Sequence, residues 1–263
     1  MTTYSTAGFE RLELSIAGVR TVAYAAGSGP DLVYFHGGGT FHGFDFARDW
    51  TAHFRVLLPY HPGFGESADA PAIESLGGYV SHYLALFDAL ALTSFHLAGA
   101  SLGGRLAAEF AVLRPERVRR LVLVAPGGIT TPAFPQPDFS RIAYHEWPAY
   151  FTHDPEVVRP YWPNKPDAEF LAARGREAQA VGRIALSEGL DASRLARIRA
   201  PTLLIWGKED RMVPAGNAPQ WQVRIPGSTV RIIDRAGHLL LDESPAARAA
   251  LAEFLKDAGN HEL

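Results

Sequence analysis

The chain carries the pentapeptide Gly99-Ala100-Ser101-Leu102-Gly103 between a short apolar run at 95–98 and a helix-like stretch at 105–113. This arrangement is the sequence form of a nucleophile elbow, a sharp strand-to-helix turn that exposes a serine hydroxyl. The positions two before and two after the serine must be small, because a side chain there strikes the neighbouring strand or helix. A serine is a weak nucleophile at neutral pH. The rest of the chain must therefore supply a base and an acid that orients it.

The composition predicts one core domain, alone or with an insertion. The chain has 263 residues, of which 47% are hydrophobic, and this is enough for one large core. The net charge of −3 gives no basic field, so we expect neither nucleic acid nor a membrane as a partner. Without cysteine there is no disulfide, thiolate nucleophile or cysteine metal site. The N-terminal residues lack a signal-peptide pattern and no stretch has the length of a membrane span, which favours the cytoplasm.

Short apolar runs alternate with helical patterns along most of the chain. Alternating apolar residues predict two antiparallel strands, at 12–16 and 19–23, joined at Ala17-Gly18. Six continuous runs follow, typical of strands covered on both faces: Leu32–Phe35, Val56–Leu58, Phe95–Ala98, Val118–Val124, Leu203–Trp206 and Val230–Ile233. Apolar residues spaced by three and four predict helices at 76–90 and 246–254. The alternation predicts an α/β fold with a doubly wound, mostly parallel sheet of about eight strands.

One segment, residues 130–190, interrupts this alternation. Because the next strand is delayed far beyond an ordinary loop length, we expect an inserted cap, or lid, on a core formed by 1–129 and 191–263. Between positions 131 and 170 its aromatic content is about twice that of the whole chain. The aromatic residues are Phe134, Phe139, Tyr144, Trp147, Tyr150, Phe151, Tyr161, Trp162 and Phe170. Such a cluster favours an apolar binding pocket covered by short helices.

Glycines and polar residues follow the predicted strands, where catalytic groups gather in sheets of this kind. The strand that ends at Phe35 is followed by His36-Gly37-Gly38-Gly39, a turn whose backbone N–H groups can face a developing oxyanion. Asp210 and His238 follow two later strands. A serine, an acid and a histidine thus occur at three strand ends, in that order along the chain.

These features resemble the α/β-hydrolase fold family, in which Ser, Asp and His occur in this order on successive strand ends. Four further sequence motifs resemble those of the family: His36-Gly37-Gly38-Gly39, Pro62-Gly63-Phe64-Gly65-Glu66-Ser67, Pro201-Thr-Leu-Leu-Ile-Trp-Gly207, and Gly237-His238 with Glu243-Ser244-Pro245. The resemblance covers the body from about Leu12 to Leu255 and leaves the insertion unassigned. It implies a serine hydrolase with a catalytic triad.

The resemblance also implies a role for each residue of the site. His238 takes the proton from Ser101 and returns it to the leaving group, while Asp210 orients the imidazole. The backbone N–H groups of Gly38 and Leu102 form the oxyanion hole. The expected substrate-binding residues are Gly39, Trp147, Phe151, Trp162 and Leu239.

Several neighbouring residues compete for these roles. Glu209 precedes Asp210, but the family pattern places the acid three residues after the glycine, which favours Asp210. Asp234 is interpreted as a solvated or loop-bracing residue and His36 as a brace of its own turn. We expect neither a cofactor nor a metal, since the remaining histidines show no metal-ligand spacing.

Three functions remain open from the sequence. The first is hydrolysis of a small carboxylic ester or lactone with an apolar acyl part. The second is cleavage of a carbon–carbon bond in 2-hydroxy-6-oxo-dienoates, the products of aromatic ring cleavage, with Arg174, Arg176 or Arg183 as the carboxylate ligand. Against it, Ala100 replaces the asparagine usual before the nucleophile in that subfamily, and Leu239 the tryptophan usual after the histidine. The third is a ligand-binding receptor without catalysis.

One further departure from the family pattern concerns the loop before Pro62. The acidic residue that usually stands two before the Pro-Gly-Phe-Gly stretch is Tyr60 here, and His61 follows it. We expect this change to affect how the loop is braced and to leave the triad untouched.

Overall fold

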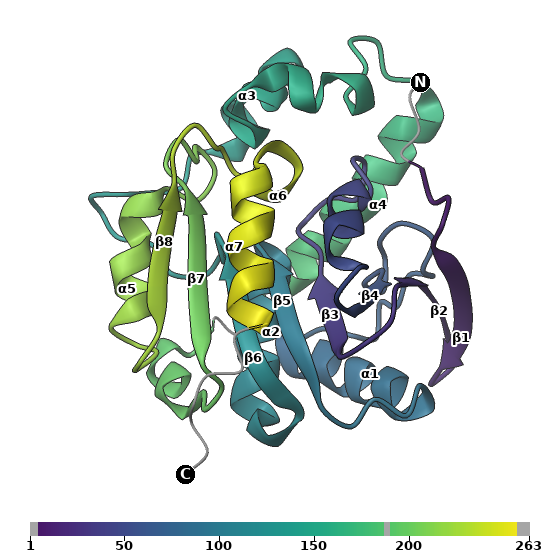
Figure 1. Ribbon diagram of the computed structural model, residues 1–263. Coiled ribbons are helices and arrows are strands. Elements are labelled where there is room, and N and C mark those ends of the chain that lie inside the picture. The colour runs from purple at the N-terminus through teal and green to yellow at the C-terminus, as the bar shows by residue number, and fades with distance from the viewer. Residues whose placement is uncertain (1–4, 187–189, 257–263) are drawn as a thin grey trace.

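The computed structural model describes residues 5–186 and 190–256, and its central element is an eight-stranded sheet (Figure 1). The strands are β1 Glu10–Ile16, β2 Val19–Ala26, β3 Asp31–Phe35, β4 Arg55–Pro59, β5 Phe95–Ala100, β6 Val118–Val124, β7 Thr202–Gly207 and β8 Thr229–Ile233. β1 and β2 form the predicted antiparallel hairpin, and both of its turn residues, Ala17 and Gly18, have positive φ.

The strand order is β1-β2-β4-β3-β5-β6-β7-β8. β1 and β2 are antiparallel to their neighbours, whereas the pairs from β4 to β8 are parallel. The carboxyl ends of the parallel strands therefore meet at one edge of the sheet, where ligands bind in open α/β sheets. The predicted fold class, a mostly parallel doubly wound sheet, is confirmed.

β8 is the exception to the pattern predicted from its sequence. The run at 230–233 was expected to be covered on both faces, but Arg231 and Ile232 are exposed, and 44% of the Ile232 surface is accessible. β8 is the last strand in the order and pairs with β7 alone. The expectation of a doubly covered strand was wrong, because an apolar run does not reveal whether its strand lies at an edge.

Helices cover both faces of the sheet. They are α1 Leu76–Ala89, α2 Leu102–Leu113, α3 Trp147–Phe151, α4 Ala168–Leu186, α5 Ala218–Gln222, α6 Leu240–Glu243 and α7 Pro245–Lys256. Figure 1 shows α7 in front of the sheet, while α2 packs on β5 and β6 from the other face and contacts α1. Ser75 caps α1 at its predicted start by accepting a hydrogen bond from Gly78 N. In the described parts of the chain, no helix is long and apolar enough to cross a membrane.

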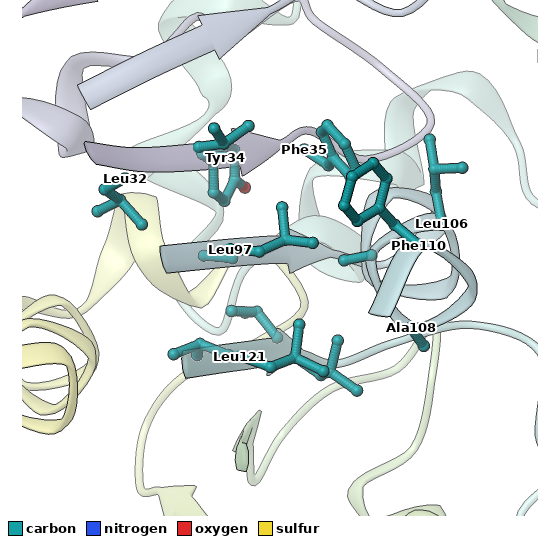
Figure 2. Close-up of a cluster of buried hydrophobic side chains, with 14 of the residues drawn as sticks. Leu32, Tyr34, Phe35, Leu97, Leu106, Ala108, Phe110 and Leu121 are labelled. Atoms are coloured by element: carbon teal, nitrogen blue, oxygen red, sulfur yellow. The ribbon is translucent and has the colours of Figure 1, made fainter. Parts of the chain in front are cut away.

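The core beside the carboxyl edge is formed by β3, β5, β6 and α2. Figure 2 shows Phe35 of β3 beside Phe110 of α2, with ring centroids 6.4 Å apart. Leu97 of β5 and Leu121 of β6 are fully buried in the same cluster. Burial of each such side chain stabilises the fold by roughly 1.5–3 kcal/mol. This packing fixes the end of β3 relative to the end of β5, and hence the glycine turn relative to Ser101.

The chain between β6 and β7, called the insertion below, contains residues 130–190, for which the sequence predicts a cap. Besides α3 and α4 it contains the short turns η3 Phe139–Arg141, η4 Tyr144–Glu146, η5 Pro155–Val157 and η6 Arg159–Tyr161. Figure 1 shows α3 at the top of the molecule. The expectation of short helices is wrong for α4, which has 19 residues. Four other short turns are described outside residues 130–190: η1 Asp45–Trp50, η2 Pro115–Arg117, η7 Ala192–Arg197 and η8 Ala215–Asn217.

The domain boundaries, 130–190 for the cap and 1–129 with 191–263 for the core, stay predictions. Residues 187–189 of the predicted cap, and residues 1–4 and 257–263 of the predicted core, lie outside the described residues.

Candidate active site

Ser101 lies at the turn between β5 and α2. Its backbone angles, φ 52° and ψ −115°, are outside the regions that residues other than glycine usually adopt. Ser101 N donates to Val124 O at 2.9 Å, and Gly127 N donates to Ser101 O at 3.0 Å. Strained backbone of this kind persists only where neighbouring structure holds it, and it is enriched at functional sites. The turn has the geometry of the predicted nucleophile elbow.

The two glycines of the pentapeptide leave no room for a side chain. A Cβ atom on Gly99 would lie 2.3 Å from Gly103 O. A Cβ atom on Gly103 would lie 2.2 Å from Phe35 O and 2.3 Å from His36 O. The first turn of α2 is therefore pressed directly against the backbone that leaves β3.

We expect Gly103→Ala to destabilise the fold by about 3 kcal/mol or more, because β3 or α2 must move to relieve contacts with two carbonyl oxygens. Gly175→Ala in α4 is the matched control, since nothing lies within 4 Å of its Cβ position. Alanine in an open helical position stabilises by about 0.5–1 kcal/mol relative to glycine. Urea unfolding measures both changes, and equal stability of the two variants would contradict the packing of α2 on β3.

Asp210 and His238 form a buried pair. His238 Nδ1 donates to Asp210 Oδ2 at 2.8 Å, and the two side chains are 5% and 0% exposed, respectively. Asp210 Oδ1 also accepts from Met212 N and Val213 N, each at 2.8 Å. Because a carboxylate only accepts hydrogen bonds, a neutral His238 ring carries its proton on Nδ1 and can accept a proton on Nε2. This is the arrangement required of a general base.

The two competing carboxylates have other partners. Glu209 Oε2 accepts from Ala236 N at 3.0 Å, which braces the loop before the histidine. Asp234 accepts from Lys208 Nζ at 2.6 Å, and this hydrogen bond lowers the pKa of the Asp234 carboxyl. Of the three acids weighed from the sequence, Asp210 is the one that the structure joins to the histidine.

Glu243 connects the histidine loop to the insertion. Gly237 N donates to Glu243 Oε2 at 2.8 Å, and His153 N and Asp154 N donate to the same carboxylate at 3.0 and 2.6 Å. Glu243 stands five residues after His238, within the Glu243-Ser244-Pro245 motif. Its position behind Gly237-His238 was the signal that could have assigned this bracing role.

Two neutral histidines brace the turn after β3. His36 Nδ1 donates to Gly37 O at 2.7 Å, and His36 Nε2 accepts from His61 N at 3.0 Å. His61 Nε2 donates to His36 O at 2.8 Å, and its Nδ1 pairs with the Tyr83 hydroxyl. Burial lowers the pKa of His36 well below its ordinary value and that of His61 to about 4. These contacts agree with the interpretation of His36 as a brace.

The buried histidines predict that stability falls as the pH drops below 6.5. Between pH 6.5 and about 4 the unfolded chain protonates His61 and the folded chain does not, so the unfolded state binds more protons. A pKa that falls from 6.5 to about 4 corresponds to about 3 kcal/mol, present above pH 6.5 and lost on acidification. Burial also lowers the pKa of His82 and His96 to about 4, which steepens the loss.

Urea unfolding at about pH 7.5 and about pH 5 checks this prediction, because most carboxyl groups titrate below this range. Equal free energies of unfolding at the two pH values would contradict the assignment of neutral, buried histidines.

The two expected oxyanion donors lie on either side of Ser101. Leu102 is the first residue of α2, so its N–H has no partner within the helix. Gly38 is exposed at the tip of the glycine turn, and a Cβ atom on the preceding Gly37 would lie 3.4 Å from Ser101 Cβ. The turn is therefore adjacent to the serine. The oxyanion role of both N–H groups stays a prediction.

An aromatic cluster in the insertion contacts the loops that carry the candidate residues. Phe41, Met212 and Leu239, which follow β3, β7 and β8, pack against this cluster. Each is close in sequence to a candidate residue of the site. The buried members of the cluster are Phe151, Val158, Trp162 and Phe170. Four of the five expected binding residues are therefore part of it or contact it: Phe151 and Trp162 are members, and Trp147 and Leu239 pack against them. The fifth, Gly39, lies beside Phe41.

Helix α4 lies against the glycine turn. A Cβ atom on Gly38 would lie 3.2 Å from Val181 Cγ2, and one on Gly39 would lie 3.4 Å from Arg174 Nη1. Glu177, on the same helix, is only 2% exposed. Sequence reasoning missed Glu177, because nothing in the sequence distinguishes a carboxylate that faces the core from one that faces solvent until the docking of α4 is known.

Of the three arginines proposed from the sequence, Arg174 is the one beside the glycine turn. Arg176 and Arg183 instead contact the loop after β4. Arg174 Nη1 pairs with Glu177 Oε2 at 2.5 Å, and its guanidinium lies 5.6 Å from the ring centre of Phe41.

Of the three residues of the expected triad, all of which the structure describes, Asp210 and His238 are joined by a hydrogen bond, and Ser101 is not hydrogen-bonded to either. Among the described residues, no hydrogen bond connects Ser101 Oγ to the His238 ring. Such contacts are often long in enzymes without substrate and tighten when substrate binds. The three residues share the carboxyl edge of the sheet, on the loops after β5, β7 and β8.

A metal requires several convergent ligands. Within residues 5–186 and 190–256, no group of three or more His, Asp or Glu side chains is placed to hold a metal ion. The expectation that the protein uses neither a metal nor a cofactor stays a prediction.

A model of the alpha/beta hydrolase family matches residues 32–251, which include the carboxyl end of β3, the elbow and both partners of the Asp–His pair. The chain belongs to the alpha/beta hydrolase family. This α/β hydrolase is 30% identical over 240 residues to a 2-hydroxy-6-oxo-6-phenylhexa-2,4-dienoate hydrolase of Burkholderia cepacia, covering 81% of this chain and 82% of the relative. It is 28% identical over 251 residues to a 2-hydroxy-6-oxo-2,4-heptadienoate hydrolase of Pseudomonas putida, covering 84% and 87%.

Solved structures agree with this family fold. A meta-cleavage product hydrolase from Pseudomonas fluorescens superimposes on this α/β hydrolase with a TM-score of 0.78, at 21% identity, covering 94% of this chain and 98% of the other. A naproxen esterase from Bacillus subtilis gives a TM-score of 0.75, also at 21% identity, covering 94% and 92%. The fold is therefore shared by a protein named as an esterase and by one named as a meta-cleavage product hydrolase.

Proposed function

We propose that this α/β hydrolase is a serine hydrolase that cleaves small carboxylic esters or lactones with an apolar acyl part. The observation that carries the proposal is the buried Asp210–His238 pair, at 2.8 Å, on the sheet edge where the strained Ser101 lies. A hydrolase with a base oriented by a buried acid and a serine in an elbow has the parts needed for acyl transfer.

In the proposed reaction, Ser101 Oγ attacks the substrate carbonyl while His238 Nε2 takes the hydroxyl proton. The negative oxygen of the tetrahedral intermediate accepts hydrogen bonds from Gly38 N and Leu102 N. The bond from the acyl carbon to the leaving oxygen then breaks, and His238 protonates the departing alcohol. Water, deprotonated by His238, attacks the acyl-enzyme and releases the acid together with the free serine. Asp210 keeps the imidazole in the required tautomer throughout.

The insertion is proposed to act as a cap that supplies the apolar part of the substrate pocket. Phe151 and Trp162 are each 8% exposed, and their ring centroids lie 5.2 Å apart in the aromatic cluster. Leu239, next to the proposed base, contacts the same cluster. We propose that Gly39, Trp147, Phe151, Trp162 and Leu239 contact the substrate. The cytoplasmic location expected from the sequence stays a prediction.

The proposal is tested with the wild-type protein and a panel of nitrophenyl esters and lactones of increasing acyl length. We expect hydrolysis with a preference for apolar acyl chains over charged ones. Absence of turnover across the panel, together with resistance to a fluorophosphonate probe, would contradict the proposal.

A second candidate is hydrolysis of a carbon–carbon bond in a 2-hydroxy-6-oxo-dienoate. It is supported by the activities named for the relatives and by the position of Arg174 beside Gly39, where a cation could receive a substrate carboxylate. Against it, Glu177 already supplies a carboxylate to Arg174 at 2.5 Å and would repel a second one. Ala100 and Leu239 also depart from that subfamily. The same enzyme sample incubated with such a dienoate, followed by its absorbance, distinguishes the two candidates.

A further inference from the structure

Helix α4 inserts a buried carboxylate behind the glycine turn. Glu177 is 2% exposed and lies 137 positions after Thr40 in the chain. Thr40 Oγ1 donates to Glu177 Oε1 at 2.5 Å, and Thr40 N donates to Glu177 Oε2 at 3.3 Å. One carboxylate thus accepts both the side-chain and the backbone hydrogen of the residue that ends the turn.

The same carboxylate has two further partners. Gly65 N, in the loop after β4, donates to Glu177 Oε1 at 3.3 Å, and Arg174 Nη1 pairs with Oε2 at 2.5 Å. Four donors therefore converge on Glu177. Burying a charge is costly unless it is paired and hydrogen-bonded, and this set of partners meets that requirement.

These contacts bear directly on the turn that carries Gly38. Thr40 is two residues beyond Gly38, and Val181, one helical turn beyond Glu177, lies 3.2 Å from the Cβ position of Gly38. On its other side the turn is held by His36, whose Nδ1 donates to Gly37 O. A glycine turn has little stiffness of its own, so the direction of the Gly38 N–H depends on these two anchors.

We propose that Glu177 is a positioning residue, which holds the Gly38 N–H in the place where it stabilises the oxyanion. The insertion would thus contribute to catalysis as well as to the substrate pocket. This inference rests on the proposed function, and specifically on the oxyanion role of Gly38. Preorganised donors stabilise a transition state because no reorganisation is needed at the moment of reaction.

The first test compares Glu177→Gln with Glu169→Gln, a control on the same helix whose side chain is exposed. The amide keeps the shape of the carboxylate but turns one acceptor into a donor, opposite either Thr40 or Arg174. We expect kcat to fall about 10- to 100-fold in Glu177→Gln, with KM changed less than about twofold, since displaced catalytic donors lower kcat. Rates are referred to active sites counted by burst titration, which removes the contribution of unfolded protein.

A second pair of variants keeps the test valid if Glu177→Gln folds poorly. Thr40→Val removes the hydroxyl that donates to Glu177, and Thr40→Ser retains it. We expect kcat for Thr40→Ser to exceed that for Thr40→Val by about tenfold, because loss of a hydrogen bond to a charged group changes an equilibrium by roughly this factor. Equal kcat values for the two variants, or a Glu177→Gln effect confined to KM, would overturn the proposal.

Hydrogen exchange separates a failure of this inference from a failure of the proposed function. If Glu177 anchors the turn, the Thr40 amide, which donates to Glu177, exchanges about tenfold faster or more in Glu177→Gln, at unchanged global stability. This readout needs no substrate. Unchanged exchange contradicts the anchoring role even when the enzyme is active. Faster exchange in a protein that hydrolyses no ester upholds the anchor and overturns the assignment of the turn as an oxyanion hole.

Discussion

Ser101→Ala is expected to lower kcat for ester hydrolysis by about 10⁵-fold or more, the size of loss seen when the nucleophile of a serine hydrolase is removed. The change removes the only atom that forms the acyl bond in the proposed reaction. The fold should persist, because Ser101 N and O, which hold the turn, belong to the backbone. Alanine also occupies a positive-φ position elsewhere in the chain, at Ala125, although with a cost in strain.

The measurement is steady-state hydrolysis of a short-chain nitrophenyl ester, with thermal unfolding as a check on folding. Ser81→Ala is the control, since Ser81 is an exposed serine on α1 that hydrogen-bonds only locally to Gly77 O. The proposal predicts wild-type kcat for this control. Substantial ester turnover by folded Ser101→Ala would show that another group attacks the carbonyl.

Asp210→Asn is expected to lower kcat by about 10⁴-fold, with little effect on folding. The amide oxygen can keep both hydrogen bonds from Met212 N and Val213 N, which Oδ1 accepts, but facing His238 the side chain then presents an N–H in place of Oδ2. The ring then carries its proton on Nε2 and cannot accept the one from Ser101. Transition-state stabilisation by the imidazolium–carboxylate pair is lost as well.

The matched control is Asp234→Asn, which changes a carboxyl in the histidine loop that is exposed and paired with Lys208. Exposed ion pairs of this kind contribute little to stability, so Asp234→Asn should fold normally and its kcat should remain near the wild-type value. Hydrolysis of the same ester is followed across pH. If Asp234→Asn lost activity while Asp210→Asn kept it, the assignment of the acid would be reversed.

The elbow and the Asp–His pair could be predicted because their signals are local. A serine between two glycines, after an apolar run and before a helix, leaves few backbone conformations, and the φ of 52° at Ser101 is one of them. Asp210 was chosen over Glu209 by its distance from Gly207, and the structure pairs it with His238. Strand ends in a parallel sheet meet at one edge, so the position of these residues on one edge could be predicted from the parallel direction of the strands.

Features that depend on how distant elements dock could not be predicted. Glu177 is one of several charged residues on α4, and it is buried only because this helix packs on a turn more than 130 positions earlier. Arg174, Arg176 and Arg183 were equivalent in sequence for the same reason. β8 appeared to be a covered strand because its position at the end of the sheet is a property of the whole topology. Local periodicity carries no information about how distant elements dock or about the position of a strand in the sheet.

The most direct test of the account is to label the wild-type protein with a fluorophosphonate and locate the adduct by mass spectrometry. Because the probe reacts with a serine that a neighbouring base activates, the account predicts a single adduct on the peptide containing Ser101. Labelling should be absent in Ser101→Ala and strongly slowed in Asp210→Asn. An adduct on a different residue, or ester hydrolysis by a protein that the probe does not label, would contradict the account.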